Sequence, residues 1–401
     1  MTVRIKLLAP LAMVCALYTS SLQAQTFKTD PALLKTINKN FTDADAQYKV
    51  LAGRLKPDRF PKTYYADKDS LETSASGWWC SGFYSGTALY LYQQTKDMAL
   101  LADANKSLGY LAKEQYNKGT HDLGFMMYCS FGNAMKVEPK DEYKQILINS
   151  AKSLSTRFNP KMGVIKSWNS NKPEYLVIID NMMNLELLFW ATHATGDSSY
   201  YKIAVAHANT TMKNHFRPDY SSYHVVVYDP ETGAVKERRT AQGYANESAW
   251  ARGQAWGLYG YTTLYRETKD KKYLQQANHI AKFILNNPNL PADKIPYWDF
   301  NAPNIPNALR DASAAAVMSS ALLELCKYTD AADAKTYFKV AETILRNLSA
   351  PKYKAAAGTN GGFILKHSVG HFPNQTEIDV PLTYADYYFV EAMLRYKNFA
   401  K

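Results

Sequence analysis

The sequence contains a long series of helical repeats. Apolar side chains recur with the spacing of one helix face through most of the chain, whereas the alternation typical of a half-buried strand is scarce. The pattern predicts twelve helices, over about residues 31–55, 80–94, 98–117, 123–137, 141–157, 181–195, 198–215, 250–267, 270–287, 311–328, 332–349 and 383–396.

The connections between these helices alternate between short and long. Short joints share a threonine and an aspartate, as in Thr95-Lys96-Asp97 and Thr268-Lys269-Asp270, whereas long loops precede the apolar helices. The helix over 141–157 is charged and amphipathic, and the one over 311–328 is apolar nearly all round and must be buried. Six buried helices ringed by six amphipathic ones describe an all-α (α/α)6 toroid, whose long loops gather at one end. An α-solenoid is the competing architecture, but it gives the loops less reason to alternate.

The first 24 residues have the composition of a secretory signal peptide. Arg4 and Lys6 precede an apolar run that ends in small and polar residues at Ala24. This run is too short for a permanent membrane span, and no later segment is apolar for long enough. We therefore expect a signal peptide over 1–24, a single domain over 25–401, no membrane insertion and export, which means a periplasmic location in a bacterium with an outer membrane.

Charge and motif content narrow the possible partners. Removing two positive charges with the signal peptide lowers the net charge from +11 to +9, and a basic exported protein could bind nucleic acid, an anionic surface or an acidic substrate. No run of five or six consecutive basic residues is present, so no nucleic-acid partner is expected. His367 and His371 are four apart, but a glycine between them and the following Pro373 argue against a helical metal site. The spacing of the remaining cysteines also predicts neither zinc nor a disulfide framework, and we expect no cofactor.

Unusual side chains stand just before the buried helices. Aromatic rings can cover the C–H faces of a sugar, while carboxylates and arginines bind its hydroxyl and acidic groups. Their convergence on one end of a toroid predicts a carbohydrate pocket. The stretches concerned are Gly77-Trp78-Trp79, His121-Asp122, Asp180-Asn181, the segment from Trp250 to Trp256, Arg310-Asp311 and Tyr384-Ala385-Asp386.

Asp180 is the most informative of these residues, because it lies between Ile-Ile and Met-Met in YLVIIDNMMNLELLFW. A buried, unpaired carboxylate costs free energy or shifts its pKa until it is neutral. The simpler interpretation is that Asp122 and Asp180 are helix N-caps, a position that favours aspartate. In a toroid the two interpretations are compatible, since the N-termini of the inner helices face the shared cavity.

Several segments resemble the unsaturated glucuronyl hydrolases, glycoside hydrolase family 88, in order along the chain: SGWWCSGFYSGTALYLYQQTKD, HDLGFMMYCSFGNA, VIIDNMMNLELLFWATHATGD, SSYHVVVYDPETG, TAQGYANESAWARGQAWGLYGYT, RDASAAAVMSSALLEL and EIDVPLTYADYYFVEAML. The resemblance implies an enzyme that removes the 4,5-unsaturated uronic acid from the non-reducing end of lyase-generated oligosaccharides by hydrating its C4=C5 enol ether. It implies that Asp180 acts as general acid and then base. Asp122 would bind the sugar hydroxyls and raise the pKa of Asp180.

The same resemblance implies a set of substrate-binding positions. They match Trp78, Trp79, His121, Trp168, His224, Gln242, Arg252 and Trp256, with either Trp78 or Trp79 stacking on the sugar. The segment KHSVGHFPN, with Lys366, Ser368 and His371, resembles a loop that in some members contacts the next sugar or its sulfate. The substrate would be a glycosaminoglycan fragment from chondroitin, hyaluronan or heparin. The alternatives are an unsaturated rhamnogalacturonyl hydrolase acting on pectin fragments, another (α/α)6 activity such as a polysaccharide lyase, and a non-catalytic periplasmic sugar-binding protein.

Overall fold

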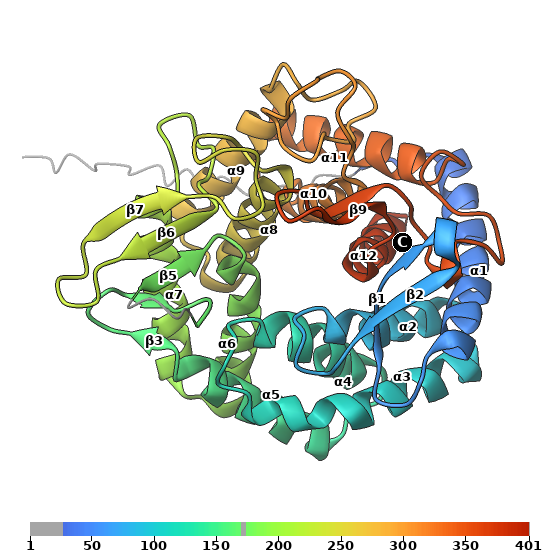
Figure 1. Ribbon diagram of the computed structural model, residues 1–401, viewed down its shortest axis with the longest axis horizontal. Helices are drawn as coiled ribbons and strands as arrows, with labels where there is room; N and C mark the ends of the chain where they lie inside the picture. The colour runs from blue at the N-terminus through green and yellow to red at the C-terminus, as the bar shows by residue number, and fades with distance from the viewer. Residues whose placement is uncertain (1–26, 170–173, 401) are drawn as a thin grey trace, which may run out of the picture.

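The computed structural model describes residues 27–169 and 174–400, in which two concentric rings of helices form a barrel (Figure 1). The predicted signal peptide over 1–24 lies outside the described residues. The outer helices are α1 (Pro31–Arg54), α3 (Met98–Leu111), α5 (Asp141–Ser155), α7 (Ser198–Asn214), α9 (Lys271–Asn286) and α11 (Ala331–Leu348). The inner helices are α2 (Ser81–Thr95), η3 (Gly124–Gly132) with α4 (Asn133–Val137), α6 (Asn181–Thr195), α8 (Ala251–Thr268), α10 (Ala312–Leu325) and α12 (Thr383–Asn398).

The inner helices close on themselves. Each one contacts the next in the order α2, η3, α6, α8, α10 and α12, and α12 returns to contact α2. A solenoid would leave its first and last helices apart. The predicted (α/α)6 toroid is therefore confirmed. No helix in the described part of the chain is long and apolar enough to cross a bilayer.

Aspartates start most of the outer helices. Each of these carboxylates accepts a hydrogen bond from a backbone N–H in the first turn of its helix, which satisfies a group that has no partner within the helix. In the short joints the preceding threonine hydroxyl also accepts a bond from the aspartate N–H, as for Asp97, Asp197 and Asp270. This explains the recurring threonine and aspartate. The capping residues are Asp30, Asp97, Asp197, Asp270 and Asp330.

One predicted helix, over 123–137, has a different form. It begins as the π-helix η3 (Gly124–Gly132) and becomes α-helical only at α4. At Gly124, a Cβ atom would lie 2.4 Å from the Cα of Asn184 in α6. The missing side chain therefore allows η3 to approach α6 closely, which brings the start of one inner helix next to the start of another.

The long connections contain strands that the sequence did not predict. Hairpins form between β1 (Phe60–Tyr65) and β2 (Ser70–Ser74), between β3 (Phe158–Asn159) and β4 (Val164–Ile165), and between β8 (Ser368–His371) and β9 (Thr376–Val380). A three-stranded sheet joins β5 (Tyr175–Ile178), β6 (Val225–Tyr228) and β7 (Val235–Arg239). β1 also contacts β9, so two hairpins lie beside each other over the ring (Figure 1). Treating these segments as loops was wrong.

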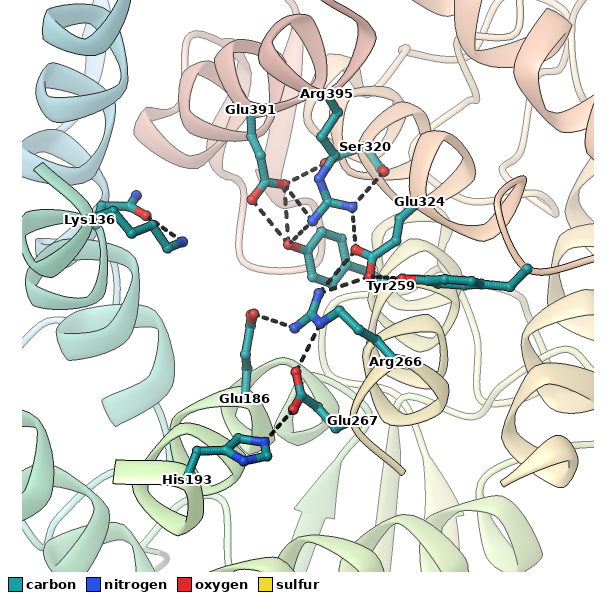
Figure 2. A network of polar contacts seen from close by, with 12 residues as sticks. Lys136, Glu186, His193, Tyr259, Arg266, Glu267, Ser320, Glu324, Glu391 and Arg395 are labelled. Atoms are coloured by element: carbon teal, nitrogen blue, oxygen red, sulfur yellow. Dashed lines mark hydrogen bonds and ion pairs between the residues drawn. The ribbon is translucent and has the colours of Figure 1, made fainter. Parts of the chain in front are cut away.

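A network of largely buried charged groups occupies the opposite end of the barrel (Figure 2). Glu324 of α10 bonds both Arg266 of α8, at 2.9 Å, and Arg395 of α12, at 2.5 Å. Arg395 also donates to the Tyr259 hydroxyl at 2.8 Å, and that hydroxyl donates to Glu391 at 3.1 Å. Arg266 further pairs with Glu186 of α6 and Glu267. The network links four inner helices and lines a cavity of about 600 Å³.

Candidate active site

The loop end of the barrel holds a second cavity, of about 580 Å³, which is large enough for a small sugar ligand. Eight of the predicted site residues line it: Trp78, Trp79, His121, Asp122, Trp168, Asp180, Gln242 and Arg252. The structure therefore brings together residues that lie up to 174 positions apart, as Trp78 and Arg252 do. Chain segments from several inner helices meet here because all of these helices start at this end.

Strand pairing places Asp180 beside His224. β5 leads directly into α6, and β5 pairs with β6 so that Ile178 lies opposite Val225. One residue further along, the Ile179 N–H donates to the His224 carbonyl at 3.1 Å. The ring of His224 thereby reaches the next residue of the chain, and its Nε2 lies 3.8 Å from Oδ2 of Asp180.

The hydrogen bonds of His224 define its tautomer. Its Nδ1 accepts bonds from the backbone N–H groups of Ala241 and Gln242, at 3.1 and 3.2 Å. Burial lowers the pKa of His224 well below its usual value, and the Arg252 guanidinium adds to this effect. The ring is therefore neutral and carries its proton on Nε2, which has no hydrogen-bond partner. The N–H donor of His224 therefore lies on the ring nitrogen that is 3.8 Å from Oδ2 of Asp180.

Asp180 does not cap α6. Its backbone is helical, with φ −57° and ψ −26°, and its side chain accepts no bond from the first turn. The carboxyl group is buried, and its Oδ2 has no hydrogen-bond partner. Burial raises its pKa to about 7; the Arg252 charge opposes this rise and the Asp122 charge adds to it. A carboxyl group with this pKa can give and take a proton near neutral pH.

Asp122 is the second buried carboxyl group of the cavity. It accepts a bond from the Thr120 hydroxyl at 2.8 Å, and its Oδ1 lies 3.3 Å from Nε2 of His121. Burial raises its pKa to about 6, although Thr120 and the charge of Arg157 oppose the rise. The close η3–α6 packing described above brings Asp122 near Asp180, because each residue lies at the start of one of these two elements.

Arg252 lines the cavity and forms hydrogen bonds to two other chain segments. Its terminal nitrogens donate to the carboxylate of Asp311 at 3.1 Å and to the carbonyls of Val369 and Gly370 at 2.5 and 2.7 Å. Gln242 donates to the same Gly370 carbonyl at 3.1 Å. These bonds tie strand β8 to α8, and only Nε of the guanidinium lacks a partner. Arg252 therefore positions the β8–β9 hairpin as well as lining the cavity.

The two neighbouring tryptophans have different surroundings. Trp79 packs against Tyr384 and Phe125, with ring centroids 4.8 and 5.5 Å apart. Trp78 is 43% exposed, and the ammonium of Lys62 lies 5.0 Å from the centre of its ring. Trp78 is therefore the more exposed of the two rings at the mouth of the cavity, whereas Trp79 lines the cavity and packs against the core.

Four predicted residues do not line the cavity. His224 and Trp256 are buried next to it, and Trp256 Nε1 has no hydrogen-bond partner. Lys366 instead donates to the Pro351 carbonyl at 2.8 Å, and Ser368 is fully buried in β8. The structure gives no contact between Lys366 or Ser368 and the cavity, so their interaction with a neighbouring sugar stays a prediction.

Sequence reasoning missed much of the cavity mouth. Lys62, Tyr65 and Glu72 come from the β1–β2 hairpin, and Asn374, Thr376 and Glu377 come from the β8–β9 hairpin. TEIDV alternates between polar and apolar residues, but FPKTYY does not, so local patterning gave little sign of the β1–β2 hairpin. His371, which the sequence did single out, also lines the cavity. In the described part of the chain no group of three His, Cys, Asp or Glu side chains could hold a metal ion.

An (α/α)6 barrel with two buried carboxyl groups of raised pKa in one open cavity has the features of a glycoside hydrolase. Residues 56–263 match Glycosyl Hydrolase Family 88. An unsaturated glucuronyl hydrolase of Formosa agariphila is 44% identical over 368 residues, covering 91% of each chain. The chain therefore belongs to glycoside hydrolase family 88, as the resemblance predicted.

Solved structures agree with this assignment. An unsaturated glucuronyl hydrolase specific for heparin matches with a TM-score of 0.88 and 48% identity, covering 91% of this chain and 98% of that one. An Asp-to-Asn variant of the Streptococcus agalactiae unsaturated glucuronyl hydrolase, in complex with dGlcA-GalNAc6S, matches with a TM-score of 0.77 and 27% identity, covering 93% of this chain and 98% of that one.

Proposed function

We propose that this chain is an unsaturated glucuronyl hydrolase that acts on unsaturated oligosaccharides derived from glycosaminoglycans. The observation that carries the proposal is the state of Asp180, a buried carboxyl group with a pKa raised to about 7 and no hydrogen bond to its Oδ2. Such a group is costly for the fold unless a substrate uses it. Family membership adds the reaction class.

The reaction begins with proton transfer to carbon. The carboxyl group of Asp180 gives its proton to C4 of the unsaturated uronic acid, and the electrons of the C4=C5 bond form the new C4–H bond. Positive charge develops at C5 and is shared by the ring oxygen. The neutral His224 adds no positive charge beside this centre, and its Nε2–H can support the carboxylate that Asp180 becomes.

Water then completes the hydration. The Asp180 carboxylate takes a proton from a water molecule as its oxygen bonds to C5, which returns Asp180 to its acid form. The product is a hemiketal. Its ring opens by cleavage of the bond between C5 and the ring oxygen, which leaves a ketone at C5 and a hemiacetal at C1. That hemiacetal collapses to an aldehyde and releases the neighbouring sugar.

Among glycosaminoglycan fragments, we propose heparin-type disaccharides as the preferred substrates. The heparin-specific relative shares 48% identity with this chain, compared with 27% for the Streptococcus agalactiae enzyme in complex with a sulfated galactosamine disaccharide. In a heparin-type substrate the uronic acid is joined to glucosamine rather than galactosamine, so the two classes place the second sugar differently at the cavity mouth.

The direct test follows the ultraviolet absorbance of the enol ether with purified protein. Unsaturated heparin disaccharides should lose absorbance fastest, chondroitin disaccharides more slowly and unsaturated rhamnogalacturonan disaccharides least. Rising absorbance on intact polysaccharide would instead indicate a lyase. Tight binding of every disaccharide without loss of absorbance would indicate a sugar-binding protein, and the proposal would fail.

We also propose that the chain is exported and loses residues 1–24, leaving 25–401 as a single catalytic domain. The charged start, apolar run and small residues before Gln25 support this. N-terminal sequencing of protein from fractionated cells should find a chain beginning at Gln25 outside the cytoplasm, in the periplasm of a host with an outer membrane. A chain that still begins at Met1 in the cytoplasm would refute export.

A further inference from the structure

The depth of the catalytic groups determines where the second sugar lies. Asp122 and Asp180 are only 7% exposed, whereas Trp78 at the mouth is 43% exposed. The unsaturated residue is the end of its chain and must bring C4 to Asp180. The sugar attached to it must therefore extend towards the mouth, past the two hairpins that line it.

Three charged side chains from these hairpins meet at the mouth. The ammonium of Lys62 in β1 lies 2.6 Å from Glu72 Oε1 in β2 and 3.6 Å from Glu377 Oε1 in β9. The side chains of Lys62 and Glu377 are 17% and 16% exposed, so both are largely withdrawn from water. All three residues line the cavity. We call them the mouth triad.

The neighbouring strand leaves room for Glu377. A Cβ atom at Gly370 of β8 would lie 2.4 Å from Oε2 of Glu377, so only a glycine at this position permits the carboxylate to lie there. Glu377 itself has a positive φ of 55°, an uncommon conformation for a residue with a side chain. The β8–β9 hairpin therefore holds this carboxylate against the cavity at a cost in backbone freedom.

With both carboxyl groups ionised, the mouth triad carries one more negative than positive charge. Burial raises the pKa of Glu377, and the charge of Lys62 opposes this rise. Other cations do not reverse this excess: Arg252 is bonded to Asp311 and to two carbonyls, and Lys366 bonds to the Pro351 carbonyl away from the cavity. Burial and the charge of Arg252 lower the pKa of His371, which keeps that ring neutral. A sulfate placed here would meet two carboxylates and a single ammonium that both already bind.

We propose that Lys62, Glu72 and Glu377 make the second-sugar end of the cavity anionic, so that the enzyme selects disaccharides without a sulfate on that sugar. The inference rests on the proposed function and adds the substrate class to it. Like charges brought together in a partly buried site repel strongly, and this repulsion separates similar ligands even where it adds little affinity.

The test compares two unsaturated heparin disaccharides that differ only in a 6-O-sulfate on the N-acetylglucosamine. For the wild-type enzyme, kcat/KM should be about tenfold higher or more for the unsulfated disaccharide. Glu377→Gln removes a carboxylate and should reduce this ratio about fivefold, mainly through a lower KM for the sulfated disaccharide. Lys62→Met removes the ammonium and should increase the ratio. Added salt should narrow the wild-type ratio.

Two further variants separate the charge effect from other causes. Asp67→Asn removes an exposed carboxylate from the turn of the same β1–β2 hairpin, outside the cavity lining, and should leave the ratio unchanged. Glu72→Gln should act like Glu377→Gln, which keeps the test valid if Glu377→Gln does not fold. Equal rates on both disaccharides, or a ratio that Glu377→Gln and Glu72→Gln leave at the wild-type value, would overturn the inference. No turnover of either disaccharide would refute the proposed function instead.

Discussion

The two ends of the barrel hold cavities of nearly the same volume, about 580 and 600 Å³, but their polar groups are in opposite states. At the loop end, Asp180 Oδ2, His224 Nε2 and Trp256 Nε1 are buried and make no hydrogen bond of normal geometry, although the Trp256 side chain lies close enough to Asp180 to lower its pKa. At the opposite end, Glu324 and Arg395 each bond several neighbours (Figure 2). Among the described residues, no buried side-chain atom of that network lacks a partner.

The difference shows that volume alone does not identify the active site. A buried polar group without a partner costs about 1–3 kcal/mol, and the loop-end cavity has three of them close together, on Asp180, His224 and Trp256. A substrate can supply the missing partners. In the charge network every buried polar side-chain atom of the described residues has a partner, and its members hold the inner helices to one another. We therefore assign catalysis to the unsatisfied end and stability to the satisfied end.

Asp180→Asn should have the largest effect. The amide cannot deliver a proton, so kcat should fall about 10²–10⁴-fold while KM changes little. Folding raises the pKa of Asp180 from 3.8 to about 7. The contribution of this group to stability is therefore fully present below pH 3.8 and is lost as the pH rises through about 7. The variant should therefore unfold at a higher temperature than the wild type at about pH 8, as measured by calorimetry. A variant that kept a tenth of the wild-type rate would remove Asp180 from this role.

Glu324→Gln should have the opposite profile. It leaves Arg266 and Arg395 without the carboxylate they share, and loss of one partner from a buried ion pair costs about 3–5 kcal/mol. Urea unfolding should show this loss, while kcat/KM per folded molecule stays at the wild-type value. Glu138→Gln is a matched control, because its 3.4 Å pair with Lys140 is partly exposed and contributes at most about 1 kcal/mol. A large loss of turnover in Glu324→Gln would contradict the assignment of stability, and not catalysis, to the charge network.

The same network predicts how the fold responds to acid. Burial by itself would raise the pKa of Glu324, but the charges of Arg395 and Arg266 outweigh it and lower the pKa from 4.5 to about 2. The contribution of Glu324 to stability is therefore present above pH 4.5 and is lost as the pH falls through about 2. The stability of the wild type should therefore decline more steeply over this range than that of Glu324→Gln.

Asp122→Asn should shift the pH dependence of the reaction. The charge of Asp122 helps to raise the pKa of Asp180, so its removal should lower that pKa. Wild-type kcat/KM should fall as the pH rises through about 7, because the acid form of Asp180 is required. In the variant this fall should occur at lower pH, with a higher KM as well. An unchanged pH profile and KM would show that Asp122 neither binds the substrate nor affects the pKa of Asp180, and that its role is structural.

Asp330→Ala should have the smallest effect. This aspartate caps outer helix α11 and accepts bonds from the N–H groups of Ala332 and Asp333, both at 3.0 Å. Its loss should cost about 1 kcal/mol of stability and leave turnover unchanged. Compared with Asp180→Asn, it shows that an aspartate at a helix start serves either as a cap or as an acid according to its surroundings. A variant with wild-type stability would question the capping role.

How much the sequence predicted follows from the range of the interactions. Helix positions and capping aspartates depend on residues within one or two turns, so periodicity located them. The apolar neighbours of Asp180 are also local, and they correctly indicated a buried carboxyl group. The mouth triad depends on two hairpins far apart in the chain, and Arg252 on carbonyls 117 and 118 residues away. No local pattern encodes those contacts.

Delivery of a proton from Asp180 to C4 can be followed directly by NMR, during the reaction of an unsaturated heparin disaccharide in D₂O. If Asp180 is the donor, the uronic acid product should contain a single deuterium at C4, in one stereochemical position, and Asp180→Asn should form no such product. Release of a sugar that still contains its C4=C5 double bond would contradict this role of Asp180. So would equal labelling of both C4 positions by the wild-type enzyme.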